Sequence, residues 1–223
     1  MNQFVQNFLN IDSLLLIYPL LLQGLQLTIY LSLVALPLAL LSGLSVAILY
    51  SFGSRLARRF IIVFIDILRS FPVLVLLVLI FYGLPFVGVT MGAFFAAVLA
   101  LVLNNTGYFG EIFRAGFEAV PKGQYEAASA LGFHRFRATV LIILPQAVQK
   151  VVAPLASNSL ELVKTTSIGA LVALPELLRS ARVAQEQTYN PTPLVAAAVI
   201  FFVLLWPFAR WVARLERRAL ARR

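Results

Sequence analysis

The feature that most restricts the fold of this chain is a series of apolar runs, several of them at least about 20 residues long. A helix of about 20 apolar residues crosses the hydrocarbon core of a bilayer. Of the residues, 61% are hydrophobic and only 12% are charged, whereas a soluble domain carries about 25% charged residues. The runs do not alternate in polarity as the strands of a membrane barrel do. The sequence therefore predicts an all-α polytopic membrane protein.

We expect a single transmembrane domain, residues 1–223, with five spans. The spans are expected at about 18–50, 60–84, 92–116, 139–170 and 194–212. Pro72 is expected to kink or break the second span. The fourth contains Pro145, Pro154 and several polar groups, so it is expected to be a broken span whose polar part is buried in protein or faces a cavity. Residues 2–16 are either an interfacial helix or a frayed terminus.

Basic residues gather in three polar segments, which are 51–59, 118–137 and the tail that begins at Arg210 and ends in the basic stretch 213–223. The positive-inside rule places these segments in the cytoplasm, with the amino terminus outside and the carboxyl terminus inside. The polar segment 175–193 is expected to be an amphipathic outer segment. The net charge of +9 is explained by this topology, so membrane lipid and not nucleic acid is expected around the chain. The first residues lack the basic region of a cleaved signal peptide.

Several charged and amide groups lie inside the predicted spans. Asp66 and Arg69 are three residues apart, and we favour an ion pair between them over a transport role. Asn104 and Asn105 are costly at mid-depth unless they are paired. They either bond to neighbouring helices or line a wet cavity.

No group of residues predicts catalysis or cofactor binding. The chain has no cysteine and a single histidine, His134, and no cluster has metal-ligand spacing. There is no glycine loop for a phosphate. The sequence predicts a non-catalytic membrane subunit that holds neither a metal nor a cofactor.

The segment 118–145 is a polar region between two apolar runs. Pro121-Lys122-Gly123 is typical of a turn, and residues 124–131 have the composition of a short helix. Gly132 follows at the position of a left-handed cap. The helix either docks into a groove of a soluble partner or is a plain cytoplasmic loop helix.

The spacing within this segment resembles the EAA motif of permease subunits of bacterial ABC importers. Glu126-Ala127-Ala128 is followed after three residues by Gly132, and after nine more by Ile142-Ile143-Leu144-Pro145. Shorter stretches between residues 23 and 182 resemble the polar amino acid branch (histidine, glutamine or glutamate type) of that family. These stretches are Gln23–Thr28, Leu68–Pro72, Phe81–Pro85, Gly110–Gly116, Pro121–Gln124, Leu144–Ala147, Lys164–Ser167 and Pro175–Leu178. Ser70-Phe71, Glu161 and Thr165 depart from the usual family residues, which bears on the substrate and not on the class.

The resemblance implies a type I ABC importer permease fold, with five transmembrane helices and a cytoplasmic coupling helix at about 123–132. It also implies two cytoplasmic ATPase subunits, a second permease that is identical or paralogous, and a periplasmic or lipid-anchored binding protein. ATP and Mg would lie on the ATPase subunits, and an amino acid would be carried inward across the bacterial cytoplasmic membrane. The residues expected to couple to the ATPase are Lys122, Gly123, Glu126, Ala127, Ala128, Gly132 and Pro145. A stand-alone secondary transporter or channel for a small polar solute is the alternative, followed by a structural subunit without a pathway.

A zwitterion at mid-membrane needs charged or dipolar partners. The candidates are Asn104, Asn105, Asn158, Ser159, Glu161 and Thr165. Glu161 either attracts the ammonium group or a cationic side chain of a substrate, or it pairs with Lys164 three residues away, and we slightly favour the pair.

Overall fold

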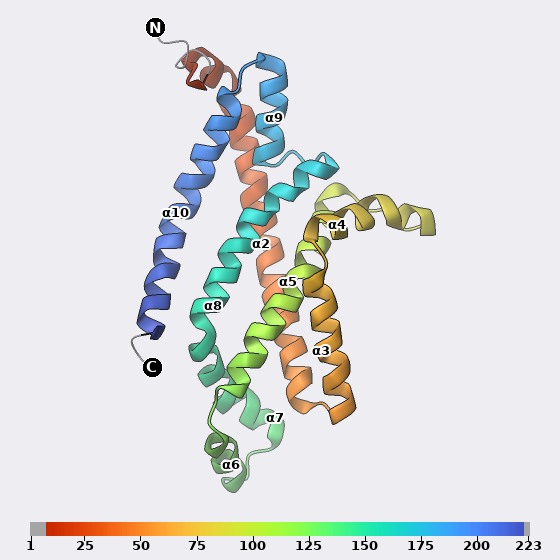
Figure 1. The fold of residues 1–223 in the computed structure, drawn as a ribbon, viewed down its shortest axis with the longest axis vertical. Helices are drawn as coiled ribbons and strands as arrows, with labels where there is room; N and C mark the ends of the chain where they lie inside the picture. The colour runs from red at the N-terminus through yellow and green to blue at the C-terminus, as the bar shows by residue number, and fades with distance from the viewer. Residues whose placement is uncertain (1–7, 221–223) are drawn as a thin grey trace. The chain divides into compact units, whose positions relative to one another are not determined.

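The computed structural model describes residues 8–220, with side chains to Arg218, and every regular element in this range is a helix (Figure 1). The α-helices are α2 (Ile11–Phe52), α3 (Arg55–Ser70), α4 (Val73–Val78), α5 (Ala93–Glu118), α6 (Lys122–Ala130), α7 (Arg135–Ala138), α8 (Leu144–Thr165), α9 (Leu177–Thr188) and α10 (Thr192–Leu220). Two π-helical turns, η1 (Leu79–Gly83) and η3 (Thr139–Ile143), and two 3-10 helices, η2 (Leu84–Val87) and η4 (Thr166–Val172), connect or extend them.

Four helical segments among the described residues are long and apolar enough to cross a membrane. They are Ile11–Phe52, Ala93–Glu118, Arg135–Val172 and Thr192–Arg218. The segments Arg55–Ser70 and Val73–Val87 pass the same test only as one interrupted span, which raises the number to five. The expected interruption therefore occurs, because Phe71 is extended and Pro72 caps the next helix.

Two predicted boundaries differ from the observed helices. The helix α2 is continuous from Ile11, so no break separates an interfacial helix from the first span in residues 11–18; residues 2–7 of that predicted helix lie outside the described range. The fourth span is also helical throughout, from Arg135 to Val172. A proline ring clashes with the carbonyl four residues before it, and the wider turn η3 lies directly before the first turn of α8, which contains Pro145. The predicted break of the fourth span is therefore wrong: the chain stays helical, and only the type of helix changes along it.

Contacts divide the chain into two compact units. The first runs to Pro37 and also contains Pro72–Leu101 and Leu160–Arg210; the second contains Leu38–Phe71, Val102–Ser159 and the chain from Trp211 onward. The core of the first unit joins α2, α9 and α10. It is formed by Ile17, Leu21, Leu177, Ala181, Ala184 and Ala197.

The first turn of α9 is capped by side chains of the first unit. The Glu176 carboxylate accepts hydrogen bonds from the backbone N–H groups of Leu178 (2.9 Å) and Arg179 (2.8 Å). Thr28 of α2 accepts one from the backbone of Leu177 at 3.0 Å. These bonds satisfy donors that a helix start would otherwise leave free. The polar segment 175–193, expected to be an amphipathic outer segment, thus contains a capped helix.

Glu176 is fully buried, and this burial raises the pKa of its carboxyl to about 7. The folded state consequently binds a proton at Glu176 more tightly than the unfolded state, whose ordinary pKa is 4.5. Protonation of Glu176 therefore contributes its full stabilisation below pH 4.5. This contribution declines as the pH rises from 4.5 to about 7 and is absent at higher pH.

We expect the melting temperature in detergent to fall between about pH 5 and pH 8 by more in the wild type than in Glu176→Gln, which cannot titrate. Gln retains an oxygen for the cap, so this variant should fold. Thermal denaturation at a series of pH values measures the difference between the two proteins. Parallel curves for the two would contradict the raised pKa.

In the second unit, α2 and α5 cross closely beside Gly43. The hydroxyls of Ser42 and Thr106 are 2.6 Å apart at this crossing. Gly43 is buried between Ala39 and Ala47, two fully buried small residues one turn away on either side. Small residues at a spacing of four allow two membrane helices to approach.

The predicted ion pair between Asp66 and Arg69 is wrong. In the described part of the chain these side chains form no salt bridge, and the Arg69 guanidinium lies 5.5 Å from the centre of the Tyr108 ring. The Tyr108 hydroxyl also donates to the Arg69 carbonyl at 3.4 Å. The aromatic face supplied by α5 attracts the cation instead.

Candidate functional site: an exposed helix and a polar cluster

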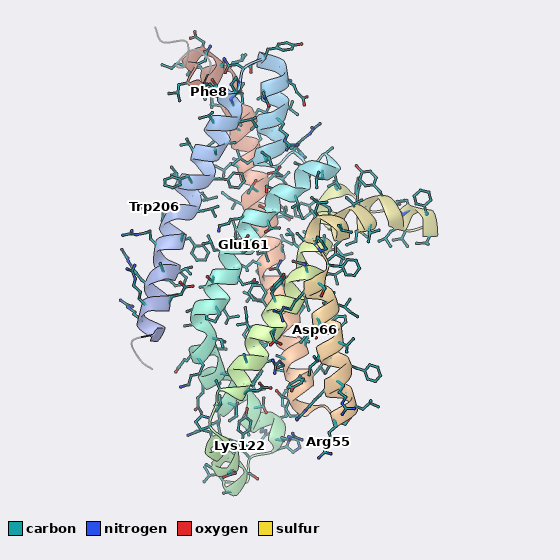
Figure 2. All side chains as sticks on the ribbon, in the orientation of Figure 1. Phe8, Arg55, Asp66, Lys122, Glu161 and Trp206 are labelled. Atoms are coloured by element: carbon teal, nitrogen blue, oxygen red, sulfur yellow. The ribbon has the colours of Figure 1, made fainter. Side chains whose placement is uncertain are left out.

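The short helix expected between the third and fourth spans is present as α6. Pro121 precedes its first residue, and Leu131 ends it. Gly132 has a φ of 78°, its N–H donates to the Ser129 carbonyl at 2.9 Å, and the Phe133 N–H donates to the Ala128 carbonyl at 3.1 Å. This pair of hydrogen bonds is the Schellman motif, which favours glycine at the left-handed position. Figure 1 shows α6 beyond the end of α5, and Figure 2 labels Lys122 there.

One side of α6 packs against other helices of the second unit. Ala128 is only 2% exposed, so its small size serves packing within this chain. The Tyr125 hydroxyl donates to the Phe117 carbonyl at 3.1 Å, and the Gln146 amide of α8 donates to the Gln124 side chain at 3.2 Å. These contacts hold α6 against the end of α5 and the start of α8.

The other side of α6 is exposed. The exposed residues among the predicted coupling set are Lys122, Gly123, Glu126, Ala127, Gly132 and, at the start of α8, Pro145. Sequence reasoning did not include exposed apolar residues of the same segment in the coupling set, among them Leu131 at 75% exposure and Phe133 at 39%. Their signal was available, because apolar residues in a polar cytoplasmic segment are candidates for an interface.

The amides inside the spans bond to neighbouring helices, which was the first of the two alternatives. Asn104 donates to the carbonyls of Leu68 (3.3 Å) and Phe71 (3.0 Å), which the end of α3 leaves without helical partners. Asn158 of α8 donates to the Asn105 side chain at 3.1 Å. The structure therefore brings two of the six predicted substrate residues, Asn105 and Asn158, into contact within the second unit.

The other predicted substrate residues make local contacts. Glu161 pairs with Lys164 at 3.2 Å, as favoured, and the two side chains are 65% and 48% exposed. The hydroxyl of Ser159 donates to the Leu155 carbonyl, and that of Thr165 donates to the Glu161 carbonyl, both at 2.7 Å. Glu161 and Thr165 belong to the first unit, whereas the asparagines and Ser159 belong to the second.

One interrupted apolar span, two buried amides on α5 and an exposed helix between two spans are typical of polytopic membrane transport subunits. The chain belongs to the family described as "binding-protein-dependent transport system inner membrane component", whose profile matches residues 35–220. This membership confirms a non-catalytic transport subunit that crosses the inner membrane several times. It also implies an ATPase and a substrate-binding protein as partners.

Similar proteins cover most of the chain. The putative glutamine transport system permease protein GlnP of Rickettsia conorii is 34% identical over 185 residues, which are 82% of this chain and 85% of the relative. The probable amino-acid ABC transporter permease protein YckA of Bacillus subtilis is 31% identical over 188 residues, with 84% and 83% covered. A solved structure described as an amino acid ABC transporter with histidines has 33% identity and a TM-score of 0.81, covering 92% of this chain and 97% of its own. The resemblance to ABC importer permeases and the expected fold are thereby confirmed.

Proposed function

We propose that this chain is the permease subunit of an ATP-binding-cassette importer that carries a polar amino acid inward across the cytoplasmic membrane. The observation that supports the substrate class is the similarity, above 30% over more than four fifths of the chain, to permeases named for glutamine or amino acids. The energy comes from ATP hydrolysis on separate ATPase subunits, which also hold the Mg.

In the proposed complex, two permeases stand above two ATPase subunits, and each α6 docks into one ATPase. The exposed residues Leu131 and Phe133 supply apolar contact, and Glu126 and Lys122 supply charge. Support for a cytoplasmic α6 comes from the second unit itself, where Figure 2 places Arg55 and Lys122 at the same end. Basic residues at one end favour the cytoplasmic side, which leaves the amino terminus outside and the carboxyl terminus inside.

For the substrate, we propose that polar groups of each unit contribute to binding, considered separately. In the second unit, the contact between Asn105 and Asn158 offers amide dipoles. In the first unit, Glu161 offers the negative charge that an ammonium group needs. An exposed ion pair is worth at most about 1 kcal/mol, so a substrate cation can compete with Lys164 for Glu161. We propose an indirect role for Asn104, whose hydrogen bonds to the carbonyls of Leu68 and Phe71 fix the end of α3.

The function is tested by reconstituting the permease with its ATPase subunits and binding protein in liposomes and measuring ATP hydrolysis with each amino acid in turn. We expect one or a few polar amino acids to stimulate hydrolysis together with uptake. Uptake by the purified permease alone would instead indicate a secondary transporter or channel. Stimulation by a sugar or peptide and by no amino acid would contradict the substrate class.

Within this complex, Glu161→Gln is expected to lower the maximal uptake rate about tenfold, because a hydrogen bond to a charged group is worth about 1.5–3 kcal/mol. Lys164→Gln is the matched control, since it breaks the same 3.2 Å pair but keeps the carboxylate. Uptake should fall in the first variant and stay close to wild type in the second. Equal effects of both would show that the pair, and not substrate binding, is what matters.

A further inference from the structure

The chain enters and leaves α6 through two covalent connections within the second unit. The one before it is the end of α5 at Glu118, and the one after it is the start of α7 at Arg135. Both contact the last three residues of α2, Tyr50-Ser51-Phe52, which we call the α2 terminus.

The connection before α6 is organised by Arg114 of α5. Its guanidinium donates two hydrogen bonds to Glu111, at 2.9 and 2.6 Å, and one to Glu118 at 2.6 Å. The same group lies 5.6 Å from the centre of the Tyr50 ring, and the Tyr50 hydroxyl donates to Glu118 at 3.4 Å. A planar guanidinium bound to two carboxylates has one orientation. The end of α5 and the α2 terminus are therefore held in a defined arrangement.

The connection after α6 reaches the α2 terminus through Arg135 of α7. Its guanidinium donates to the Ser51 carbonyl at 3.3 Å and lies 5.6 Å from the centre of the Phe52 ring. The rings of Phe52 and Phe136 are 6.2 Å apart. Hydrogen bonding, cation–π attraction and aromatic packing thus act together at this connection.

The electrostatic reason lies in α2 itself. Its last turn contains no basic residue, although the free carbonyls of a helix end attract cations. Other helices provide the cations: Arg135 from α7, and Arg58 from α3, which donates to the carbonyls of Tyr50 (3.1 Å) and Ser51 (3.2 Å).

We propose that the α2 terminus is the element through which a movement of α6 reaches α2, with Arg114 and Arg135 as the positioning residues on its two sides. This inference rests on the proposed docking of an ATPase to α6. Glu118 and Arg135 flank α6, so a displacement of α6 moves both of them. Because both contact the same three residues, α2 is displaced with α6, and α6 does not pivot freely on its connections.

The test uses the complete complex in liposomes and measures substrate molecules taken up per ATP hydrolysed. Arg135→Gln is expected to lower this ratio about fivefold, which corresponds to the loss of one hydrogen bond of ordinary strength. Arg135→Lys keeps a cation near the Ser51 carbonyl and should restore part of the ratio. Arg137→Gln is the matched control, because Arg137 is exposed and makes no side-chain hydrogen bond, ion pair or ring contact within residues 8–218.

A second readout follows the α2 terminus directly. The chain contains no cysteine, so Leu49→Cys places a single fluorophore on an exposed residue next to Tyr50. We expect ATP to change its fluorescence in the otherwise unchanged complex and in Arg137→Gln, and not in Arg135→Gln. The ATPase subunits should still copurify with Arg135→Gln and hydrolyse ATP, which a merely destabilised permease would not support.

An unchanged uptake ratio in Arg135→Gln overturns the proposal, and so does loss of ATPase copurification, which would make Arg135 a docking residue. Gly132→Val, which alters the end of α6, distinguishes a failure of α6 docking from a failure of the α2 terminus. Normal uptake in Gly132→Val would contradict the docking of α6. Impaired uptake in Gly132→Val, together with a normal ratio of uptake to ATP hydrolysis in Arg135→Gln, would contradict only the role proposed for the α2 terminus.

Discussion

Replacing Gly43 by alanine is expected to destabilise the permease by about 3 kcal/mol or more, at the upper end of what an overpacked core costs. A Cβ atom at this position would lie 2.5 Å from the Phe109 Cβ and 2.8 Å from the backbone nitrogen of Gly110. Neither atom belongs to the far end of a flexible side chain, so α2 and α5 would have to separate. Separation would also break the contact between the Ser42 and Thr106 hydroxyls, which are 2.6 Å apart.

Gly110→Ala is the matched control on the opposite helix of the same crossing. The nearest atoms to a Cβ there are 3.5 Å or more away, which is ordinary contact. Since alanine favours a helix interior over glycine by about 1 kcal/mol, this variant should be as stable as the wild type or more so. Thermal denaturation of the purified protein in detergent measures both. A stable Gly43→Ala would show that the two helices do not approach this closely.

Replacing Gly132 by valine is expected to reduce ATP-driven uptake by about tenfold, since the left-handed conformation costs an ordinary residue about 1–2 kcal/mol. The φ of 78° at Gly132 closes the Schellman motif at the end of α6. If this end unwinds, Leu131, which is 75% exposed, loses its defined position in the proposed contact with the ATPase. A Cβ at Gly132 meets nothing within 4 Å, so the cost is conformational and not steric.

Gly132→Asn separates conformation from side-chain size, because asparagine tolerates the left-handed region. We expect this variant to keep uptake within about twofold of wild type. Uptake by the reconstituted complex and copurification of the ATPase subunits are measured for both variants. Full activity in Gly132→Val would contradict the role of the α6 end, whereas loss of activity in both variants would indicate that any side chain here obstructs docking.

The α6 helix could be predicted almost to the residue, as 123–132 against the observed Lys122–Ala130 with its cap. Its turn, its helical composition and its terminal glycine are all local features, and local features act within a few residues of the chain. The spans could be predicted for the same reason, because apolar length is a property of each segment. Their ends were less accurate, since α2 and α10 continue as helices beyond the apolar core.

The partners of polar residues inside the spans could not be predicted from nearby residues of the chain. The sequence required partners for Asn104 and Asn105 but could not identify them, because the carbonyls of Leu68 and Phe71 and the amide of Asn158 come from other helices. Asp66 and Arg69 have the spacing of an ion pair, but the Arg69 guanidinium lies against the ring of Tyr108 from α5 instead. A helical spacing shows which groups can meet, whereas tertiary packing selects between them.

The class of this protein follows from its amino-acid sequence, through the helical spans, the polar helix between two of them and the EAA spacing from Glu126 to Pro145. Each of these is encoded by neighbouring residues. Three features are visible only in the folded chain: which side of α6 is exposed, that Gly43 lies at a helix crossing, and that both connections of α6 meet at the α2 terminus. Those contacts join residues far apart in the chain, and only folding brings such residues within bonding distance.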